Sequence, residues 1–299
     1  MGSDLRFAFR LLWRDRTFAA TALLTLAITI GANTAIFSIV RSVLLKPLPV
    51  PDSERIVFIY NSYPNAGAAR AEAAVPDYFD RLGDMTVFDE QAVYRRQDMT
   101  LGAAGGAERI RGVRATPSFF RLVRAVPVHG QIFSESDGEE GQELKVLLSY
   151  GFWQRQLAGD PAAVGRDLRL NGVNYTIKGV LPPGFKFLWA EIDVWIPAAF
   201  TAREKSDDSR HSNNWQMIGR LKPGATVALA QQQVDAINAR NDERFPHFHQ
   251  ILKDAGFHSV AVRLQDDVVR EIRPVLYILW GGVLFVLLLG CVNITNLVM

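Results

Sequence analysis

Hydrophobic and polar positions are distributed very unevenly along this chain. Residues 17–40 and 274–299 carry no charged side chain, whereas the segment between them alternates apolar and polar side chains over short runs. A helix rises about 1.5 Å per residue, so the first run would span roughly 36 Å, more than the roughly 30 Å of a bilayer's hydrocarbon core. The pattern predicts a membrane protein in which two transmembrane helices, residues 17–45 and 272–299, flank a soluble domain.

Two alternatives for the first run can be weighed on its length and polarity. A cleaved signal peptide has an apolar core of about 7–15 residues, and residues 17–40 exceed that length. A buried helix of a soluble protein usually keeps a polar face, which this uncharged run lacks. A membrane helix is therefore the favoured interpretation.

The charges beside the first run predict its orientation. The basic residues before it are Arg6, Arg10, Arg14 and Arg16, and those that follow it closely are Arg41 and Lys46. Basic residues accumulate on the cytoplasmic side of membrane helices. We therefore expect the N-terminus in the cytoplasm and residues 42–273 outside it.

Residues 1–16 show a second pattern, that of a basic amphipathic helix. Its apolar side chains recur at helical spacing, at Leu5, Phe9, Leu12 and Trp13, and the arginines fall on an adjoining stripe. Such a helix can lie on an anionic lipid surface or bind a cytoplasmic partner. The predicted cytoplasmic interface residues are Arg6, Arg10, Trp13 and Arg14. The alternative, that these arginines only set the topology, remains open.

Small residues recur four positions apart in the first run. Ala27, Gly31 and Ala35 would form a stripe on which another membrane helix can approach closely. Asn33, beside that stripe, would need a hydrogen-bond partner on a neighbouring helix. The predicted helix-packing residues are Ala27, Gly31, Asn33, Ala35, Asn293 and Asn296. The alternative is that glycine and alanine are simply frequent in membrane helices.

Between the two runs the pattern predicts an α+β domain. Strands are expected at residues 55–60, 88–95, 108–115, 146–148, 167–170, 173–181, 193–197, 215–221 and 259–264, and helices at residues 76–82, 118–122, 150–157 and 226–244. Asn171-Gly172 between two alternating runs is a strong sign of a β-hairpin. The glycine-rich residues 102–106 are interpreted as a turn between the strands on either side.

The order of these elements suggests two subdomains within residues 46–268. Residues 46–140 and 212–268 would form a discontinuous βαβ subdomain, and residues 141–211 would form a smaller, hairpin-rich insert. On the helix at residues 226–244, one predicted buried face consists of Val227, Ala230, Val234 and Ile237.

Motifs for catalysis and metal binding are missing from the sequence. There is no GxxxxGK[ST], GxSxG or HExxH pattern, and the single cysteine, Cys291, lies within the second apolar run. His247 and His249 could share a face of an extended segment, but no acidic or cysteine ligand stands at a suitable spacing. A net charge of +2 gives no indication of nucleic-acid binding. The sequence predicts no cofactor, no metal and no enzyme activity.

Several linked segments resemble one family. They are residues 23–51, 113–133, 147–185, 193–197, 219–230 and 273–298, and they include Leu-Pro-Pro-Gly-Phe at 181–185 and Gly-Arg-Leu-Lys-Pro-Gly-Ala at 219–225. These segments are similar to permeases of MacB/FtsX-type ABC transporters, which have a MacB-like periplasmic core domain, and are nearest to the duplicated permeases without a fused ATPase. The chain departs from the family at residues 125–131, where Val-Pro-Val-His-Gly-Gln stands in place of the usual Gly-x-x-Pro-x-x-Gly-Arg.

This resemblance implies an architecture and a mechanism. A porter-like subdomain with a sabre-like insert would lie outside the bacterial cytoplasmic (inner) membrane, and the chain would be a C-terminally truncated copy with an incomplete FtsX-like permease domain. Motion of a separate cytoplasmic ABC ATPase would pass to the periplasmic domain in an efflux or export transporter. Further partners would be a second permease half or copy, membrane lipids and a periplasmic adaptor.

Two other functions are compatible with this topology. A two-helix membrane sensor with a periplasmic ligand-binding domain predicts a signalling helix and an output domain after Met299. A membrane-tethered hydrolase predicts a clustered acid–base pair in the soluble domain.

Overall fold

The computed structural model describes residues 16–40, 48–103, 106–189 and 192–298. It divides into two compact units, each described by itself. The first, called the helix unit, lies within Met1–Lys46 and Val268–Met299, and the second, called the sheet unit, is Pro47–Asp267.

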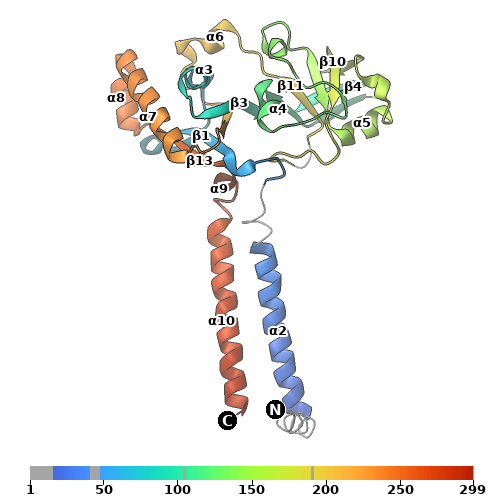
Figure 1. Ribbon diagram of the computed structural model, residues 1–299, viewed down its shortest axis with the longest axis vertical. Coiled ribbons are helices and arrows are strands. Elements are labelled where there is room, and N and C mark those ends of the chain that lie inside the picture. Colours follow the sequence, from blue (N-terminus) through green and yellow to red (C-terminus); the bar gives the residue numbers. More distant parts are fainter. Residues whose placement is uncertain (1–15, 41–47, 104–105, 190–191, 299) are drawn as a thin grey trace. The chain divides into compact units, whose positions relative to one another are not determined.

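Two long helices make up the described part of the helix unit. They are α2 (Arg16–Val40) and α10 (Arg273–Val298), which run antiparallel to each other (Figure 1). Both are long and apolar enough to cross a membrane, over Ala19–Ser38 and Arg273–Val292. The helices predicted from the two apolar runs are therefore present.

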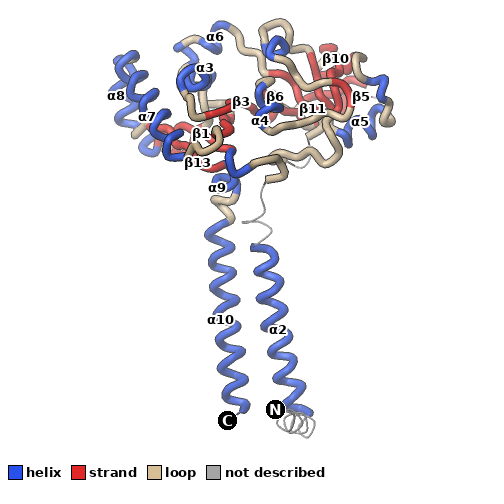
Figure 2. Tube along the Cα trace, in the orientation of Figure 1, coloured by secondary structure: helices blue, strands red, loops and turns tan. Residues whose placement is uncertain are grey.

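One mixed sheet forms the centre of the sheet unit (Figure 2). Its strand order is β13-β1-β12-β3-β6-β11-β8-β10-β9-β4-β5, with β2 paired to β1 and β7 paired to β10. The strands are β1 (Ile56–Tyr63), β2 (Ala68–Ala71), β3 (Phe88–Arg96), β4 (Met99–Ala103), β5 (Gly106–Ile110), β6 (Gly112–Ala115), β7 (His129–Gly130), β8 (Lys145–Leu148), β9 (Asp167–Leu170), β10 (Val173–Val180), β11 (Val194–Pro197), β12 (Gln216–Leu221) and β13 (His258–Arg263). Most neighbouring strands are antiparallel, whereas β10 with β8 and β11 with β6 are parallel.

Helices and 3-10 turns connect these strands. The helices are α3 (Val75–Asp84), α4 (Ser118–Leu122), α5 (Tyr150–Leu157), α6 (Ala202–Lys205), α7 (Val227–Arg244), α8 (Pro246–Ala255) and α9 (Leu264–Val268), and the 3-10 turns are η2 (Ser53–Arg55), η3 (Pro64–Ala66), η4 (Glu135–Gly138), η5 (Pro161–Ala163) and η6 (Asp207–Ser209). Thr226 accepts a hydrogen bond from the backbone N–H of Leu229, so the first turn of α7 has the side-chain cap that a helix N-terminus requires.

Local sequence patterns predicted many of these elements. α4 and β8 lie where the sequence placed them, and the predicted buried face of α7 includes Ala230, Val234 and Ile237. Asn171 and Gly172 have φ angles of 51° and 81° and connect β9 to β10. A two-residue hairpin turn of type I′ needs positive φ at both positions, and Asn-Gly meets that need with little strain.

Two segments differ from the expectation. The glycine-rich residues 102–106 fall where two paired antiparallel strands meet, as predicted, but these strands are β4 and β5, an extra hairpin paired from Met99↔Ile110 to Ala103↔Gly106, and not the strands expected at residues 88–95 and 108–115. Residues after Arg244 form α8, in which Pro246 occupies the first turn, where its missing N–H costs nothing. His247 and His249 therefore lie on a helix and not on an extended segment.

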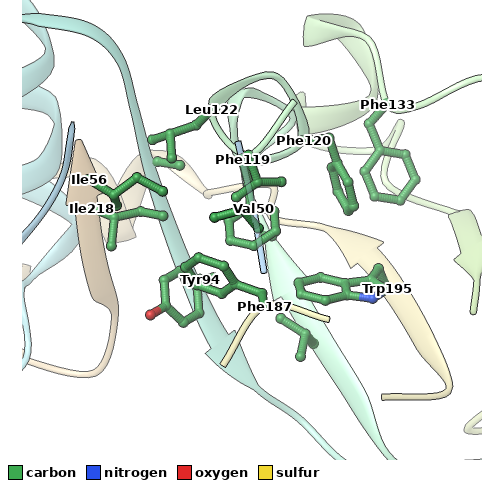
Figure 3. Close-up of a cluster of buried hydrophobic side chains, with 14 of the residues drawn as sticks. Val50, Ile56, Tyr94, Phe119, Phe120, Leu122, Phe133, Phe187, Trp195 and Ile218 are labelled. Carbon is green, nitrogen blue, oxygen red and sulfur yellow. The ribbon is translucent and has the colours of Figure 1, made fainter. Parts of the chain in front are cut away.

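Buried aromatic rings dominate one of three apolar clusters (Figure 3). Phe119 stacks on Trp195 with ring centroids 5.0 Å apart, and Tyr94 meets Phe187 edge-on at 5.5 Å. Leu264 of α9 belongs to the same cluster. Strands that are distant in sequence thus share one core, which stabilises the sheet through burial of large apolar side chains.

Another cluster bears on the predicted insert. Met99 of β4 and Ile110 of β5 pack in one core with Leu168 and Leu170 of β9. The extra hairpin therefore packs with the hairpin-rich region, although it lies outside residues 141–211. The division into two subdomains stays a prediction, and this packing favours assigning β4 and β5 to the insert.

Candidate functional site

The connections to the two long helices reach the sheet unit at one strand pair. β1 is the first strand after α2, and β13 is the last strand before α9 and α10. The two pair antiparallel, with a register from Val57↔Arg263 to Ser62↔His258. The start of one antiparallel strand lies beside the end of the other. Both connections therefore leave the sheet unit at the same end of this pair, and we call β1, β13 and the flanking residues 50–55 and 264–267 the junction.

Arg220 of β12 holds the incoming side of the junction. Its side chain donates from Nη2 to the carbonyl of Pro51 at 2.8 Å, from Nη1 to that of Asp52 at 3.3 Å, and from Nε to that of Leu122 at 2.7 Å. Arg220 is only 2% exposed. A buried guanidinium with three carbonyl acceptors fixes the segment before β1 to both β12 and the end of α4.

Two further arginines strengthen this attachment. Arg55 donates from Nε to the carbonyl of Leu221 at 2.8 Å and pairs with Asp89 at 2.7 Å. Arg124 pairs with Asp52 at 2.7 Å. These ion pairs are partly exposed, so each contributes little to stability by itself. Together they surround the segment that leads into β1.

The outgoing side of the junction is fastened by packing and charge. Leu264, the first residue of α9, is 1% exposed and packs in the aromatic cluster. Asp267 forms an ion pair with Arg70 of β2, and the Arg70 guanidinium lies over the rings of Phe58 and Tyr60 at 4.8 and 5.2 Å. The chain that leaves β13 is thus held against β1 and β2 until Asp267.

A buried polar network ties the middle of β1 to β13. Asn61 and Ser259 are register partners, and the Ser259 hydroxyl donates to Asn61 Oδ1 at 2.8 Å. Arg81 of α3, 1% exposed, donates from Nη2 to both Asn61 Oδ1 and Ser259 Oγ at 2.9 Å. Burial is the main cause that lowers the pKa of Arg81, and the nearby Asp77 carboxylate opposes it. Asp77 in turn accepts from Asn61 Nδ2 at 2.7 Å.

Within the helix unit, α2 and α10 approach at small and polar residues. Thr29 is buried, and a Cβ added at Gly290 would lie 3.0 Å from its Oγ1. Among the α10 residues whose burial is described, Leu276, Val283 and Gly290 are buried, and they are spaced by seven. A spacing of seven keeps residues on one seam of a helix, and Gly290 places this seam of α10 against Thr29 of α2.

The predicted stripe on α2 does not form this contact. Ala27, Gly31 and Ala35 are exposed, and a Cβ added at Gly31 would meet no heavy atom within 4 Å. Asn33 is half-buried and donates to the carbonyl of Thr29 on its own helix at 3.0 Å. The expectation that Asn33 lies beside the stripe was wrong, because steps of 100° per residue put Asn33 about 200° from Gly31.

The remaining predicted residues cannot be compared. Arg6, Arg10, Trp13 and Arg14 lie outside the described residues, and so do the side chains of Asn293 and Asn296, whose backbone belongs to α10. Their roles at a cytoplasmic surface and in helix packing stay predictions.

A metal cluster and a His–Asp pair beside a nucleophile are two arrangements that hydrolases use. No group of three or more His, Cys, Asp or Glu side chains among the described residues could hold a metal ion. His249 Nδ1 lies 2.7 Å from Asp242 Oδ2, and both side chains are exposed. The cavity that they border includes no serine, threonine or cysteine in its described lining. The nucleophile that a His–Asp pair would activate is missing from that place.

The residues that matter most at the junction were not found from the sequence. Arg220 follows the predicted strand pattern and is buried only because β12 lies between β1 and β3. Arg81 is the single buried arginine of α3, and no local pattern marks it. The spacing of Leu276, Val283 and Gly290 was visible in the sequence and could have predicted the seam.

Comparison with known families gives one match over most of the chain. The profile of the family described as MacB-like periplasmic core domain matches residues 19–237. That range includes most of α2 and the sheet unit as far as Ile237 of α7. A comparison with curated proteins gave no match.

Two solved structures share the fold. A domain of a protein described as a permease from Porphyromonas gingivalis superimposes with a TM-score of 0.52 at 15% identity, over 71% of this chain and 90% of that one. The periplasmic region of MacB from Actinobacillus actinomycetemcomitans gives a TM-score of 0.51 at 10% identity, over 74% of this chain and 94% of that one. At such low identity the likeness concerns the fold alone.

Proposed function

Because this chain belongs to the MacB-like periplasmic core domain family and is thus a permease of an ABC transporter, we propose that it passes the motion of a cytoplasmic ATPase to its sheet unit. The transporter would be of the efflux or export type. A permease is the non-enzymatic membrane part of such a transporter, so ATP hydrolysis would belong to a separate subunit. The N-terminus would lie in the cytoplasm, and the sheet unit is extracytoplasmic.

The junction is the observation that carries this proposal. Because β1 and β13 are neighbours, a displacement of one long helix relative to the other would act on one strand pair. The bonds of Arg220 to Pro51, Asp52 and Leu122 would resist the loosening of the incoming side. Hydrogen bonds of a charged donor are worth about 1.5–3 kcal/mol each. A displacement of a long helix would therefore move β12 and α4 together with the segment before β1 and would not break the hydrogen bonds of Arg220.

An inserted flexible linker tests this transmission. About six Gly and Ser residues placed after Arg270, between α9 and α10, would add slack without touching the junction, because such linkers behave as flexible coils. With the cognate ATPase bound, we expect ATP hydrolysis to continue. The ATP-dependent change in hydrogen exchange of β1, β13 and β12, measured by mass spectrometry, should be lost.

The same linker placed after Gly141 serves as the control, since this residue is exposed in a turn far in sequence from both connections. It should preserve both hydrolysis and the exchange response. If the variant with slack after Arg270 kept the full ATP-dependent response, transmission through the junction would be refuted. If the wild-type chain showed no ATP-dependent response, the sensor hypothesis would gain over the permease mechanism.

The proposed partners follow from surfaces that the helix unit leaves open. The stripe of Ala27, Gly31 and Ala35 is exposed, and small residues let a second helix pack closely. We assign this stripe to a second permease half or copy. Residues 1–16 are assigned to the ATPase and to anionic lipids. A periplasmic adaptor would have to bind the sheet unit.

A further inference from the structure

A cavity of about 300 Å³ opens in the sheet unit beside α7 and α8. Its size is at the lower end of the roughly 300–1,000 Å³ of small-molecule sites. The lining residues are Asp77, Arg210, His211, Asn238, Ala239, Asn241, Asp242, Phe245, Phe248, His249, Leu252, Lys253 and Phe257. This cavity lies apart from the residues that hold the incoming and outgoing sides of the junction.

Aromatic rings form the apolar part of the lining. His211 meets the rings of Phe248 and Phe257 edge-on, with centroids 5.6 and 5.5 Å apart. Phe245 lies under the Arg210 guanidinium at 4.7 Å. Most of the lining area can therefore accept an apolar group, while a few polar atoms among the rings are left to orient it.

A chain of hydrogen bonds fixes which polar atom His211 presents. The Arg81 guanidinium can only donate hydrogen bonds, so the Asn61 atom that accepts from it is Oδ1. The amide nitrogen Nδ2 of Asn61 then donates to Asn213 Oδ1 at 2.9 Å. Asn213 Nδ2 then donates to the Tyr63 hydroxyl at 3.1 Å, and that hydroxyl lies 2.8 Å from His211 Nδ1. Because the hydroxyl oxygen already accepts from Asn213, we assign the hydroxyl as the donor to Nδ1. Since Nδ1 of His211 accepts, its proton must be on Nε2.

Burial keeps both members of the last bond neutral. Desolvation raises the pKa of Tyr63 to about 12 and lowers the pKa of His211 below its ordinary value. At neutral pH the imidazole is therefore uncharged and carries one N–H at Nε2. That atom is buried and has no hydrogen-bond partner among the described residues.

Asn241 presents the complementary atom. Its Nδ2 donates to Asp80 Oδ2 at 2.8 Å, and a carboxylate only accepts, so the orientation of the amide is fixed. Its Oδ1 is buried and lacks a partner among the described side chains and backbone. Three buried polar atoms of lining residues thus lack a partner among the described residues: the N–H donors His211 Nε2 and Arg210 Nε and the carbonyl acceptor Asn241 Oδ1. An unpaired buried polar group costs about 1–3 kcal/mol, which a matching ligand would recover.

The charges around the cavity favour a neutral ligand. Arg210 is already bound by Asp77 at 3.3 Å, Asp80 at 2.8 Å and Asp207 at 2.6 Å. An anion would meet these carboxylates, and a cation would meet Arg210. The other charged groups of the lining, Asp242 and Lys253, have solvent-exposed side chains, so water and salt screen the attraction that they offer to a charged ligand.

We propose that this cavity binds a small neutral carboxamide with an apolar substituent. The amide carbonyl accepts from His211 Nε2, the amide N–H donates to Asn241 Oδ1, and the substituent packs among Phe248, Phe257 and Leu252. This proposal goes beyond the transmission of ATPase motion and does not depend on it.

The site is connected to the strand pair by hydrogen bonds. Asn238, on the cavity lining, donates to Ser259 Oγ at 3.0 Å, and Ser259 bonds to Asn61 across β13 and β1. The His211 relay also begins at Asn61. Occupancy of the cavity therefore stabilises the same network that joins β1 to β13.

Titration of the full chain in lipid nanodiscs with N-acetylphenylalaninamide, followed by calorimetry, tests the site. His211→Phe removes the donor and keeps a ring, and Asn241→Leu removes the acceptor. Each should weaken binding by about threefold to tenfold, the value of one hydrogen bond. His258→Phe and Asn174→Leu are matched controls at exposed positions outside the lining and should bind as the wild type does. N-acetylphenylalanine, which carries a carboxylate, should bind more weakly than the amide.

A measurement on the wild-type chain covers the case in which a variant fails to fold. With ¹⁵N-labelled histidine, the Nε2–H resonance of His211 should shift when the amide is added. A blocked Ala-Phe-Ala peptide distinguishes the two sources of the same chemistry, because its binding would point to a peptide chain and its exclusion to a free amide. An unshifted His211 resonance at saturating amide, or wild-type affinity in both folded variants, His211→Phe and Asn241→Leu, would overturn the proposal.

Discussion

The sheet unit turns its large apolar side chains inward, as at Phe119 and Trp195, whereas the helix unit turns comparable ones outward, with Leu23 64% and Ile278 75% exposed. In water, burial of apolar area yields about 25 cal/mol per Å². In a bilayer the lipid is as apolar as leucine, so burial does not drive helices together. The stability of the sheet unit therefore depends on the burial of large side chains, whereas α2 and α10 approach each other at small and polar residues such as Gly290 and Thr29, with Leu276 and Val283 of α10 also buried.

The largest expected effect is a loss of stability on truncating a core side chain of the sheet unit. Phe119→Ala removes a fully buried ring that contacts Tyr94 and Trp195, and such truncations cost about 3–5 kcal/mol. Denaturant unfolding followed by tryptophan fluorescence should show this loss. Ile278→Ala on α10 should leave the same transition unchanged, and an equal loss there would contradict the comparison.

A smaller loss is expected at the junction. Arg220→Met keeps the apolar stem but leaves the carbonyls of Pro51 and Leu122 without their charged donor, at a cost of about 2–4 kcal/mol. Faster hydrogen exchange at residues 51–56 would locate the effect. Arg155→Met, which breaks an exposed pair with Asp193, should cost at most about 1 kcal/mol. Comparable losses of stability in both variants would show that burial does not make the hydrogen bonds of Arg220 more stabilising than the exposed pair of Arg155.

Substitutions at two glycines, Gly290 and Gly31, distinguish the contact between α2 and α10 from the exposed stripe of α2. Gly290→Leu places atoms against Thr29 and should weaken the contact between α2 and α10 by about 1–3 kcal/mol. Fluorescence transfer between labels at Arg16→Cys and the natural Cys291 measures this contact. Gly31→Leu should leave the transfer unchanged, since its Cβ would meet no atom, and should instead reduce assembly with a cognate ATPase or second permease half. Unchanged assembly would argue against the stripe as a partner surface.

The smallest effect concerns pH. Burial lowers the pKa of His211, with Asp77 acting against it and Arg210 with it. The unfolded chain therefore takes up the proton at a higher pH than the folded one, so stability is full above about pH 6.5 and declines as the pH falls. Unfolding midpoints at pH 7.5 and 5 should differ less in His211→Phe than in the wild type. An identical difference in both proteins would assign the pH dependence to other groups.

Local elements could be predicted from the sequence, but the pairing of distant strands could not. Asn171-Gly172 and the face of Ala230 and Val234 carry their own periodicity and turn chemistry. The neighbourhood of β1 and β13, and with it the burial of Arg220, depends on the order of strands in the sheet. Only the assembled fold brings His211 and Asn241 to one cavity, because their elements show no shared pattern along the chain.

The pairing of the first strand with the last also has a consequence in time. The bond from Ser259 to Asn61 spans 198 positions, and ribosomes add about 5–20 residues per second. Roughly 10–40 s therefore pass between the synthesis of its two halves. During that interval α2 is already complete while β1 has no β13 beside it. The junction is thus among the last parts of the sheet to form. A chain whose synthesis stops in this interval contains α2 but lacks β13 and α10.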